Sequence, residues 1–277
     1  KRFINLKCLL EKHLNIFILM RSSKFKQIKV SILIANYNNE DYLNECLDSI
    51  KKQTYNNRDI EIIFHDDYSS DNSLKKIKKY KNVKIIENKI RGKFGSFNQM
   101  NAYCRAFKKS KGDIIFFLDS DDFFEKNKIK TIVNTFLNNK KIFSIFDLPI
   151  IKYEKKLKFI KNRKKILPSF WPYIPPQSCI AMRRKNFQNI LDNINFNFFP
   201  DIWMDFRIAM YLKYINNNFF ILERNLTYYR QSSTMISANF KFLSIPWWKR
   251  RIEAHAYLRY FFLKNKIKYK KNLDYIL

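Results

Sequence analysis

Three carboxylates within four residues, Asp119, Asp121 and Asp122, directly follow the apolar run of residues 114–118. Like charges at this density repel one another unless a cation or a donor-rich ligand neutralises them. Mg²⁺ and Mn²⁺ prefer oxygen ligands and commonly share them with the phosphates of a substrate. The cluster therefore indicates a divalent-cation site, although an acidic loop in which Asp121 or Asp122 caps the next helix would have the same composition.

A second acidic pair, Asp66 and Asp67, follows the β-rich run of residues 60–65. Open α/β sheets bind ligands outside the carboxyl ends of their parallel strands. A single turn would explain one acidic cluster, but two such clusters at neighbouring strand ends predict one shared polar pocket.

The elements that must position this pocket alternate between strands and helices in the first half of the chain. Alternation of this kind predicts a parallel, doubly wound α/β sheet. No strand is followed by G-x-G-x-x-G and no Walker motif occurs, so a Rossmann dinucleotide fold is disfavoured and P-loop chemistry is excluded. The expected strands cover residues 30–35, 60–65, 83–86 and 113–118, with helices between them.

The second half of the chain has a different pattern, which begins at about residue 141. Short β-like runs at 142–146 and 157–160 precede a helix at 201–214 and a strand at 219–222. We therefore divide the chain into a basic amphipathic helix at 1–27, two halves at 28–140 and 141–240, and a tail at 241–277.

The tail interleaves basic and aromatic side chains, as in Trp247-Trp248-Lys249-Arg250-Arg251. This mixture suits a helix that lies in an anionic membrane interface. It would also suit single-stranded nucleic acid, on which aromatic side chains stack. A third interpretation is a helix that packs on the domain and leaves a basic face in solvent.

The 277 residues carry a formal net charge of +30 and are 46% hydrophobic, with 27 phenylalanines. The hydrophobic content excludes a disordered chain, and the charge should attract phosphorylated substrates, anionic lipid or nucleic acid. Abundant Lys, Asn, Ile and Phe with only 3 glycines also fit compositional drift. The four cysteines form no CxxC pair, so nothing indicates disulfides or zinc, and a reducing cytoplasm fits best.

Several motifs in order give a more specific indication than any one of them. They are V-S-I-L-I-A-N-Y-N at 30–38, S-I-K-K-Q-T-Y at 49–55, E-I-I-F-H-D-D-Y-S-S-D-N-S at 61–73, and K-G-D-I-I-F-F-L-D-S-D-D at 111–122. Over about residues 29–237 the chain resembles the family 2 glycosyltransferases, which are inverting enzymes that use nucleotide-diphosphate sugars. The resemblance implies a GT-A fold: a Rossmann-like mixed sheet with a mostly parallel nucleotide-binding half flanked by helices, then an acceptor-binding half and a helical tail.

The resemblance also implies a nucleotide site at the ends of the first two strands. Asp67, next to Asp66, would accept the N3–H of a uracil base, a task that suits a carboxylate because it offers only acceptors. Tyr37 would lie against the base, and the backbone near Ala35 would contact the nucleotide. The alternative for Tyr37 is a core aromatic. Tyr68 stands where the family usually has a glycine.

The same resemblance assigns the phosphate end of the donor to the acidic cluster. Asp119 would lie near the ribose, and Asp121 would ligate Mn²⁺ or Mg²⁺ that bridges the diphosphate. Many members have a histidine where this chain has Ser232. Arg230 and Lys93 would therefore carry more of the phosphate charge, a role for which arginine is well suited.

Asp205 matches the position of the family's general base, which usually lies in a Glu-Asp pair that opens a helix. Met204 replaces the usual glutamate, and Asp201, one helical turn earlier, is the alternative base. Asp205 could instead be a surface acid paired with Arg207 or Lys213. As a base it would take the proton of the acceptor hydroxyl while that hydroxyl attacks the anomeric carbon from the opposite face, which inverts the configuration.

The resemblance thus implies a metal-assisted glycosyltransferase that moves a sugar from a UDP-sugar donor to a glycan or lipid-linked acceptor in bacterial surface polysaccharide synthesis. We expect it in the cytoplasm, with peripheral contact at the inner, anionic face of the cytoplasmic membrane, and we expect no nucleic-acid partner. One rival is a sugar-nucleotide nucleotidyltransferase, which would normally need a glycine-rich nucleotide loop that this chain lacks. The other is a basic RNA-binding protein without catalysis, whose affinity would fall steeply with salt.

Overall fold

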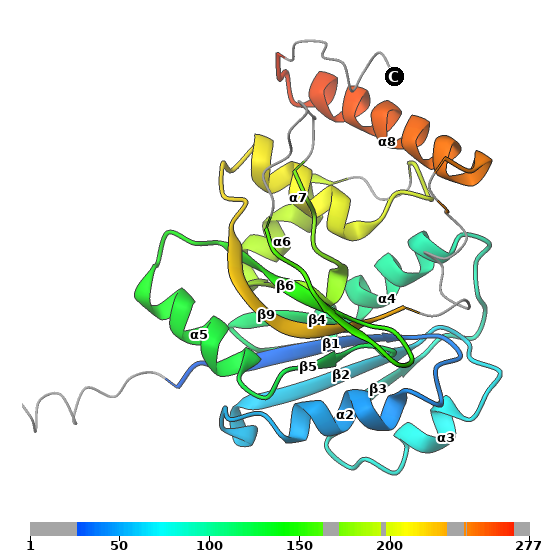
Figure 1. Cartoon of the computed structure of the whole chain (residues 1–277), viewed down its shortest axis with the longest axis vertical. Coiled ribbons are helices and arrows are strands. Elements are labelled where there is room, and N and C mark those ends of the chain that lie inside the picture. Colours follow the sequence, from blue (N-terminus) through cyan, green and yellow to red (C-terminus); the bar gives the residue numbers. More distant parts are fainter. Residues whose placement is uncertain (1–26, 163–171, 195–197, 232–240, 242, 269–277) are drawn as a thin grey trace, which may run out of the picture.

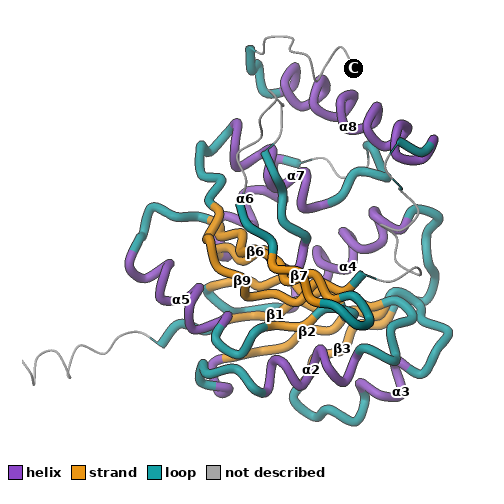
Figure 2. The backbone as a smooth tube through the Cα atoms, viewed as in Figure 1, coloured by secondary structure: helices purple, strands orange, loops and turns teal. Residues whose placement is uncertain are grey.

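A computed structural model describes residues 27–162, 172–194, 198–231, 241 and 243–268. The helix expected at 1–27 therefore lies outside the described residues, except for Gln27. The described strands form one nine-stranded sheet. Figure 2 shows this sheet as a continuous layer with helices on both sides.

The first part of the sheet is parallel and is built from the strands expected from the sequence. β1 (Val30–Asn36) lies between β2 (Ile60–Asp66) and β4 (Ile114–Asp119), and β3 (Val83–Glu87) pairs with the outer side of β2. Every residue of β1 is buried, as expected for a strand that is covered on both faces. All four strands agree with the expected bounds to within one residue. Their carboxyl ends, which precede or carry the acidic residues, therefore meet at one edge.

The second part of the sheet is mixed and joins the first through β8 (Ile180–Arg183), which runs antiparallel to β4. β6 (Ser144–Lys152) pairs with β8, β7 (Leu157–Phe159) and β9 (Ile221–Arg230), and β9 also pairs with β5 (Phe123–Phe124). The order across the sheet is β3-β2-β1-β4-β8-β6-β9-β5. The two sequence halves thus share one sheet.

β9 is longer than the sequence indicated. The expected strand at 219–222 stops before a polar stretch, but the real strand continues to Arg230. A register shift between β6 and β9 accommodates this stretch, and the side chain of Asn225 donates to the carbonyls of Pro149 and Ile160 at 3.0 and 2.9 Å. The extension brings Arg230 to the acidic cluster, as described below.

Three helices cover one face of the sheet: α2 (Leu43–Lys51), α3 (Ser73–Ile77) and α5 (Lys128–Asn138). In Figure 1, α2 and α3 lie below the sheet. α2 buries an apolar face at helical spacing: Leu43, Cys46, Leu47 and Ile50. α5 was not expected from the sequence, although its buried residues have helical spacing: Ile129, Ile132, Val133 and Phe136.

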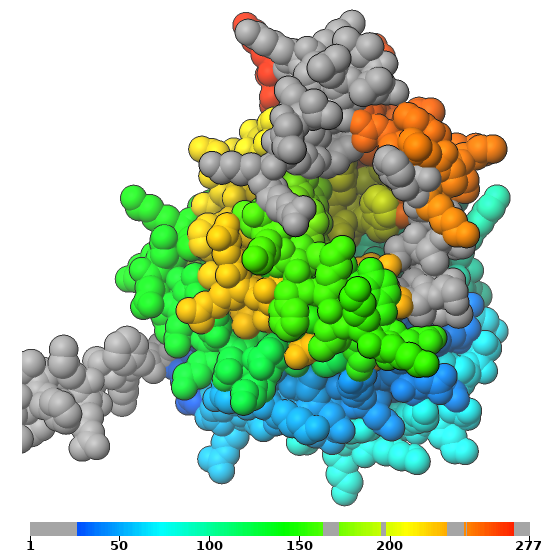
Figure 3. Space-filling view, in the orientation of Figure 1, coloured from blue at the N-terminus to red at the C-terminus, as the bar shows by residue number. Residues whose placement is uncertain are grey.

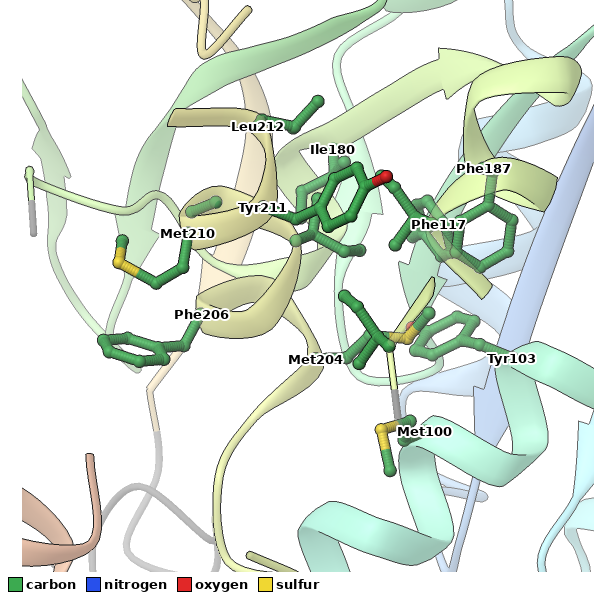
Figure 4. Packing of buried hydrophobic residues seen from close by; sticks show 14 of the residues in the cluster. Met100, Tyr103, Phe117, Ile180, Phe187, Met204, Phe206, Met210, Tyr211 and Leu212 are labelled. Carbon is green, nitrogen blue, oxygen red and sulfur yellow. The ribbon is translucent and has the colours of Figure 1, made fainter. Parts of the chain in front are cut away.

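The other face is covered by α4 (Gly95–Lys109), α6 (Arg184–Asn193) and α7 (Met204–Tyr214), and α8 (Ile245–Lys264) packs beyond α7 (Figure 1). Figure 4 shows side chains of α4, α6 and α7 meeting those of β4 and β8 in one apolar cluster. α7 begins three residues later than the sequence suggested, so the alternative base, Asp201, precedes the helix.

α8 contains most of the basic, aromatic tail, and its apolar side packs on the domain. Tyr257, Leu258, Phe261 and Phe262 are buried, and the rings of Phe262 and Tyr214 lie 4.8 Å apart. The packed-helix interpretation is therefore confirmed, while contact with a membrane stays a prediction. No helix in the described part of the chain is long and apolar enough to cross a membrane. Figure 3 shows a recess between α8, in orange, and the green segment of β6 and β7.

Candidate active site

The acidic cluster forms a turn at the end of β4, and its first member is held by α4. Oδ1 of Asp119 accepts hydrogen bonds from Gln99 Nε2 and Tyr103 Oη, both at 2.7 Å. Asp119 lies opposite Ala35 in the register of β1 and β4, and the Ala35 carbonyl accepts from Ser120 N at 3.1 Å. Burial raises the pKa of Asp119, and the two side-chain donors partly offset this effect. The fold thus brings together Ala35 and Asp119, and their contacts with a nucleotide stay predictions.

Asp122 is buried, and its hydrogen bonds hold the turn against the rest of the protein. Its carboxylate accepts hydrogen bonds from Ser178 Oγ at 2.6 Å and from Arg230 N at 2.9 Å. Ser178 Oγ in turn accepts from the backbone N–H of Asp119 at 2.9 Å. The helix-capping alternative for the cluster is wrong, because the N-cap residue of α5 is Asn127.

Asp121 is the member of the cluster that remains open to a ligand. Arg230 Nε donates to its backbone carbonyl at 2.9 Å, whereas no described side chain bonds its carboxylate. Burial, together with the charge of Asp119, raises the pKa of Asp121 to about 7. Within the described ranges, no three acidic, histidine or cysteine side chains gather into a metal site. A cation at Asp121 would therefore take most of its ligands from a substrate and water.

Asp66 shapes the turn that follows β2. Its two oxygens accept hydrogen bonds from Asn36 Nδ2 at 2.7 Å and from Ser69 N and Oγ at 2.8 and 2.7 Å. Tyr68 has a φ of 62°, in the left-handed region that normally favours glycine. The backbone therefore keeps the turn geometry of the glycine that Tyr68 replaces, and both oxygens of Asp66 are engaged in that turn.

Asp67 and Tyr37 lie close together, and one arginine contacts both. Arg91 Nε donates to Asp67 Oδ2 at 2.9 Å, and its guanidinium carbon lies 3.5 Å from the centre of the Tyr37 ring. Asn88 Nδ2 donates to the other oxygen of Asp67 at 2.9 Å. Tyr37 is 39% exposed, so the core-aromatic alternative is wrong. A flat ligand with an N–H donor would fit this pair of side chains.

α7 covers the same face of the sheet as α4, and its second residue is Asp205. Burial raises the pKa of Asp205 to about 7; the positive charge of Arg250 on α8 opposes this shift and the negative charge of Asp119 adds to it. The surface-acid alternative fits poorly, because Arg207 is buried and donates to backbone carbonyls, while Lys213 contacts an aromatic ring. Asp205 is thus a buried carboxyl group with a raised pKa, which keeps it a candidate for the general base.

Residues 31–204 match the family model described as glycosyl transferase family 2. The chain belongs to this family. An uncharacterized glycosyltransferase of Nostoc sp. is 28% identical over 222 residues, which cover 73% of this chain and 65% of the relative. A beta-1,3-glucosyltransferase of Escherichia coli that is named for UDP-Glc and for alpha-D-GlcNAc-diphosphoundecaprenol is 40% identical over 117 residues, which cover 41% of this chain and 43% of the relative.

A third relative, the poly(ribitol-phosphate) beta-N-acetylglucosaminyltransferase TarS of Staphylococcus aureus, is 30% identical over 104 residues, covering 37% of this chain and 18% of the relative. The crystal structure of TarS 1–349 in complex with UDP-GlcNAc superposes with a TM-score of 0.59 at 17% identity, covering 76% of this chain and 61% of that structure. This likeness confirms the expected GT-A fold. The chain spans less than two thirds of the length of these relatives.

In this member of glycosyl transferase family 2, Arg230 holds the acidic turn through its bonds to Asp121 and Asp122. Its guanidinium pairs with Glu45, which also binds Lys152 at 2.7 Å. Burial alone would raise the pKa of Glu45, but Lys152 and Arg230 outweigh it and the pKa is lowered. Arg230 therefore has a partner in α2 as well as its bond to the Asp121 carbonyl. Lys93, the other cation expected at the phosphates, is exposed in the loop before α4.

A buried ionic network next to Ser178 was not predicted from the sequence. Lys128 Nζ donates to Asp147 Oδ1 and to the carbonyl of Ser178, both at 2.7 Å, and also contacts Thr227. The side chains of Lys128 and Asp147 are fully buried. A lysine in a basic helix is usually solvated, so its residue type gave no signal. Because Ser178 also bonds Asp122, this network connects α5, β6 and β9 to the acidic cluster.

Gln177 is a second residue that the sequence did not mark. It is the first residue of a short 3₁₀ helix, Gln177–Cys179, which directly precedes β8 and also contains Ser178. Its side chain is buried, and neither amide atom has a hydrogen-bond partner in the described structure. Buried amides are normally paired with protein, water or ligand. Gln177 therefore has a donor and an acceptor that no described group pairs, next in sequence to Ser178.

Proposed function

We propose that this protein is a glycosyltransferase that moves a sugar from a UDP-sugar donor to a hydroxyl of a glycan or lipid-linked acceptor, with inversion. The observation that carries the proposal is one sheet edge, at which Tyr37 and Asp67 follow β1 and β2, Asp119 ends β4 and Asp121 lies in the turn after it. Such an edge is where open α/β sheets bind ligands. The donor class is supported by relatives whose names include UDP-Glc or whose structure contains UDP-GlcNAc.

The base of the donor would lie between Tyr37 and Asp67. The carboxylate of Asp67 would accept the N3–H of uracil. Asn88 holds that carboxylate by a 2.9 Å hydrogen bond, and Arg105 Nη1 donates to Asn88 at 2.6 Å. The acceptor is thus fixed before the nucleotide arrives, which lowers the entropy cost of binding.

The acidic cluster fits Mn²⁺ or Mg²⁺. Asp121 provides an open carboxylate, and one carboxylate together with diphosphate oxygens and water is a common ligand set for such ions. When bound, the ion would supply positive charge against the departing diphosphate. The protein's own part is to hold the turn in place, through Ser178 on Asp122 and through Arg230 on the Asp121 carbonyl.

Asp205 would act as the general base. With a pKa of about 7, it is more basic than an ordinary carboxylate, is about half ionised at neutral pH and becomes fully ionised at higher pH. The acceptor oxygen would form a bond to the anomeric carbon as its proton passes to Asp205. The bond from the anomeric carbon to the phosphate oxygen would break on the opposite side, so no covalent enzyme intermediate is needed.

We place this activity at the cytoplasmic face of a bacterial membrane, in the synthesis of cell-surface polymers. Relatives named for poly(ribitol-phosphate) and for a diphosphoundecaprenol-linked sugar support this placement. α8 adds an exposed side on which Trp248 and Ile252 lie among basic residues, a combination that suits an anionic interface. Co-sedimentation with anionic and neutral vesicles, for wild type and Trp248→Ala, tests the membrane contact.

Thermal unfolding with a panel of nucleotides and nucleotide sugars, with and without Mn²⁺, tests the donor site. A ligand at about 100 times its Kd should add about 2.7 kcal/mol to the free energy of unfolding. We expect stabilisation by uridine nucleotides that is reduced in Asp67→Ala, and a Mn²⁺-dependent part that is lost in Asp121→Asn. A folded protein that responds to no nucleotide would overturn the proposal. The anomeric configuration of the product, read by NMR, tests inversion.

A further inference from the structure

Arg91 contacts both side chains that the proposed function assigns to the donor base. Its guanidinium carbon is 3.5 Å from the centre of the Tyr37 ring, and its Nε is 2.9 Å from Asp67 Oδ2. At 3.5 Å the two planar groups are in van der Waals contact, so no ring fits between them. Because Asn88 bonds the other oxygen of Asp67, each carboxylate oxygen already has a donor.

The guanidinium of Arg91 and a uracil ring present the same features to this site. Each has a flat face that can stack on Tyr37, and each has an N–H that can donate to Asp67. A base that bound here in the stacked, hydrogen-bonded orientation would therefore need the space and the acceptor that Arg91 uses. The side chain of Arg91 is 26% exposed, against 6% for Asp67, so Arg91 is the partner that can move toward solvent.

The loop that carries Arg91 is anchored on both sides of it. Arg105 Nη1 donates to Asn88 Oδ1 at 2.6 Å, and Asn98 Nδ2 donates to the carbonyl of Gly92 at 2.7 Å. A Cβ atom at Gly92 would lie 2.7 Å from the Asn98 side chain, so this contact is close. Displacement of Arg91 thus requires rotation of a long side chain and leaves the loop backbone in place.

We propose that Arg91 competes with the donor base for Tyr37 and Asp67 and so determines which bases the site accepts; this inference rests on the proposed function. A base gains access only if it replaces both contacts of Arg91. Uracil does so, because its N3–H takes over the bond to Asp67. Cytosine presents an unprotonated N3 at the corresponding position, which would leave a buried carboxylate without its donor, and that loss is costly. Arg91 therefore lowers the affinity for every base and lowers it most for those without the N–H.

Isothermal titration with uridine and cytidine tests this competition, because neither nucleoside carries phosphate charge. In Arg91→Ala, uridine should bind roughly 3- to 10-fold more tightly than in wild type, which is the fold-change expected from removing one cation–π contact and its partly buried ion pair. Cytidine should gain more than uridine, because in wild type it displaces Arg91 without supplying the N–H that Asp67 then lacks. Lys89→Ala is the matched control: Lys89 is exposed in the same loop, and its removal should change uridine affinity by less than about 2-fold.

A second variant and a spectroscopic measurement guard against an effect on folding. Arg91→Lys keeps the charge but loses the planar group, so it should also bind uridine more tightly. In wild type, the Arg91 Nε–H signal in ¹⁵N NMR should shift when uridine saturates the site. Equal or weaker uridine binding in both variants, or an unshifted signal at saturation, would overturn the role of Arg91 and leave the donor site intact. If neither uridine nor UDP binds to wild type or variants, the proposed function fails and this inference fails with it.

Discussion

Arg250 on α8 and Asp205 on α7 act on each other's protonation. Burial raises the pKa of Asp205 to about 7, and the charge of Arg250 limits that rise. Burial likewise lowers the pKa of Arg250 to about 9, and Asp205 opposes that change. The sequence placed these residues in separate parts of the chain, the second half and the tail. The structure makes α8 part of the environment of the proposed base.

Asp205→Asn should lower the rate of sugar transfer by about 10²- to 10⁴-fold, because the amide cannot accept the proton. UDP binding and thermal stability should change little. In wild type, the rate should rise with pH through about 7, where Asp205 becomes ionised. Asp201→Asn is the control, since Asp201 is exposed and precedes the helix. Loss of activity in Asp201→Asn with full activity in Asp205→Asn would reverse the assignment.

Arg250→Met should raise the pKa of Asp205, because the ionised carboxylate loses a nearby positive charge. The increase of rate with pH should therefore occur at higher pH. The measurement is kcat/KM against pH, which reports groups of the free enzyme. Lys249→Met removes the same charge from an exposed neighbour and should leave the profile in place. Identical shifts in both variants would indicate a general charge effect rather than a specific one.

Lys128→Met should destabilise the protein by about 3–5 kcal/mol, because it leaves Asp147 buried without its cation. Chemical denaturation measures the loss. The double variant Lys128→Met/Asp147→Leu should recover much of it, since both charges are then removed. Lys130→Met, at an exposed position of the same helix, should change stability by less than about 0.5 kcal/mol. A small loss of stability in Lys128→Met would contradict this prediction and would mean that water reaches and hydrogen-bonds the Asp147 carboxylate.

His65 should make the protein less stable on the acid side of neutrality. It is buried, and neither ring nitrogen has a described hydrogen-bond partner. Burial lowers its pKa most, the charge of Arg105 lowers it further, and the charges of Asp67 and Asp66 partly offset this shift. The unfolded chain therefore binds this proton more readily than the native protein does. The contribution of His65 to the free energy of unfolding is fully present above its pKa in the unfolded chain, near 6.5. It declines as pH falls toward its lower pKa in the folded protein.

Urea denaturation at several pH values between 7.5 and 5 checks this prediction. His65→Phe should show a shallower loss of stability over that range, by at most about 1.4 kcal/mol per pH unit. Parallel pH dependence in wild type and His65→Phe would contradict it and would show that another group causes any acid destabilisation.

The first half of the sheet was predictable because its strands are buried on both faces and read as short apolar runs. Val30–Asn36 and Ile114–Asp119 were found for that reason. The second half was harder, since β9 depends on a side-chain bond of Asn225 and a register shift that leave no periodic signal. Tertiary contacts there override the local pattern.

The acidic residues of the site were predictable because carboxylates at strand ends are unusual in themselves. Their partners were not. Ser178 and Lys128 have ordinary roles in most proteins, and only the packing of β8 and α5 against β4 makes them neighbours of the turn. Arg91 had no role assigned from the sequence, because its stacking on Tyr37 depends on where its loop lies.

The two bonds that close on Asp122 also bear on how the chain folds. Ser178 lies 56 residues from Asp122 and Arg230 lies 108 residues from it. Contacts of such separation require long loops to close first and are slow to form. During synthesis, the acidic turn must wait for β9 to emerge from the ribosome. We therefore expect fragments that end before residue 230 to lack the bond from Arg230 to Asp122, and catalytic competence to appear as one of the last events of folding.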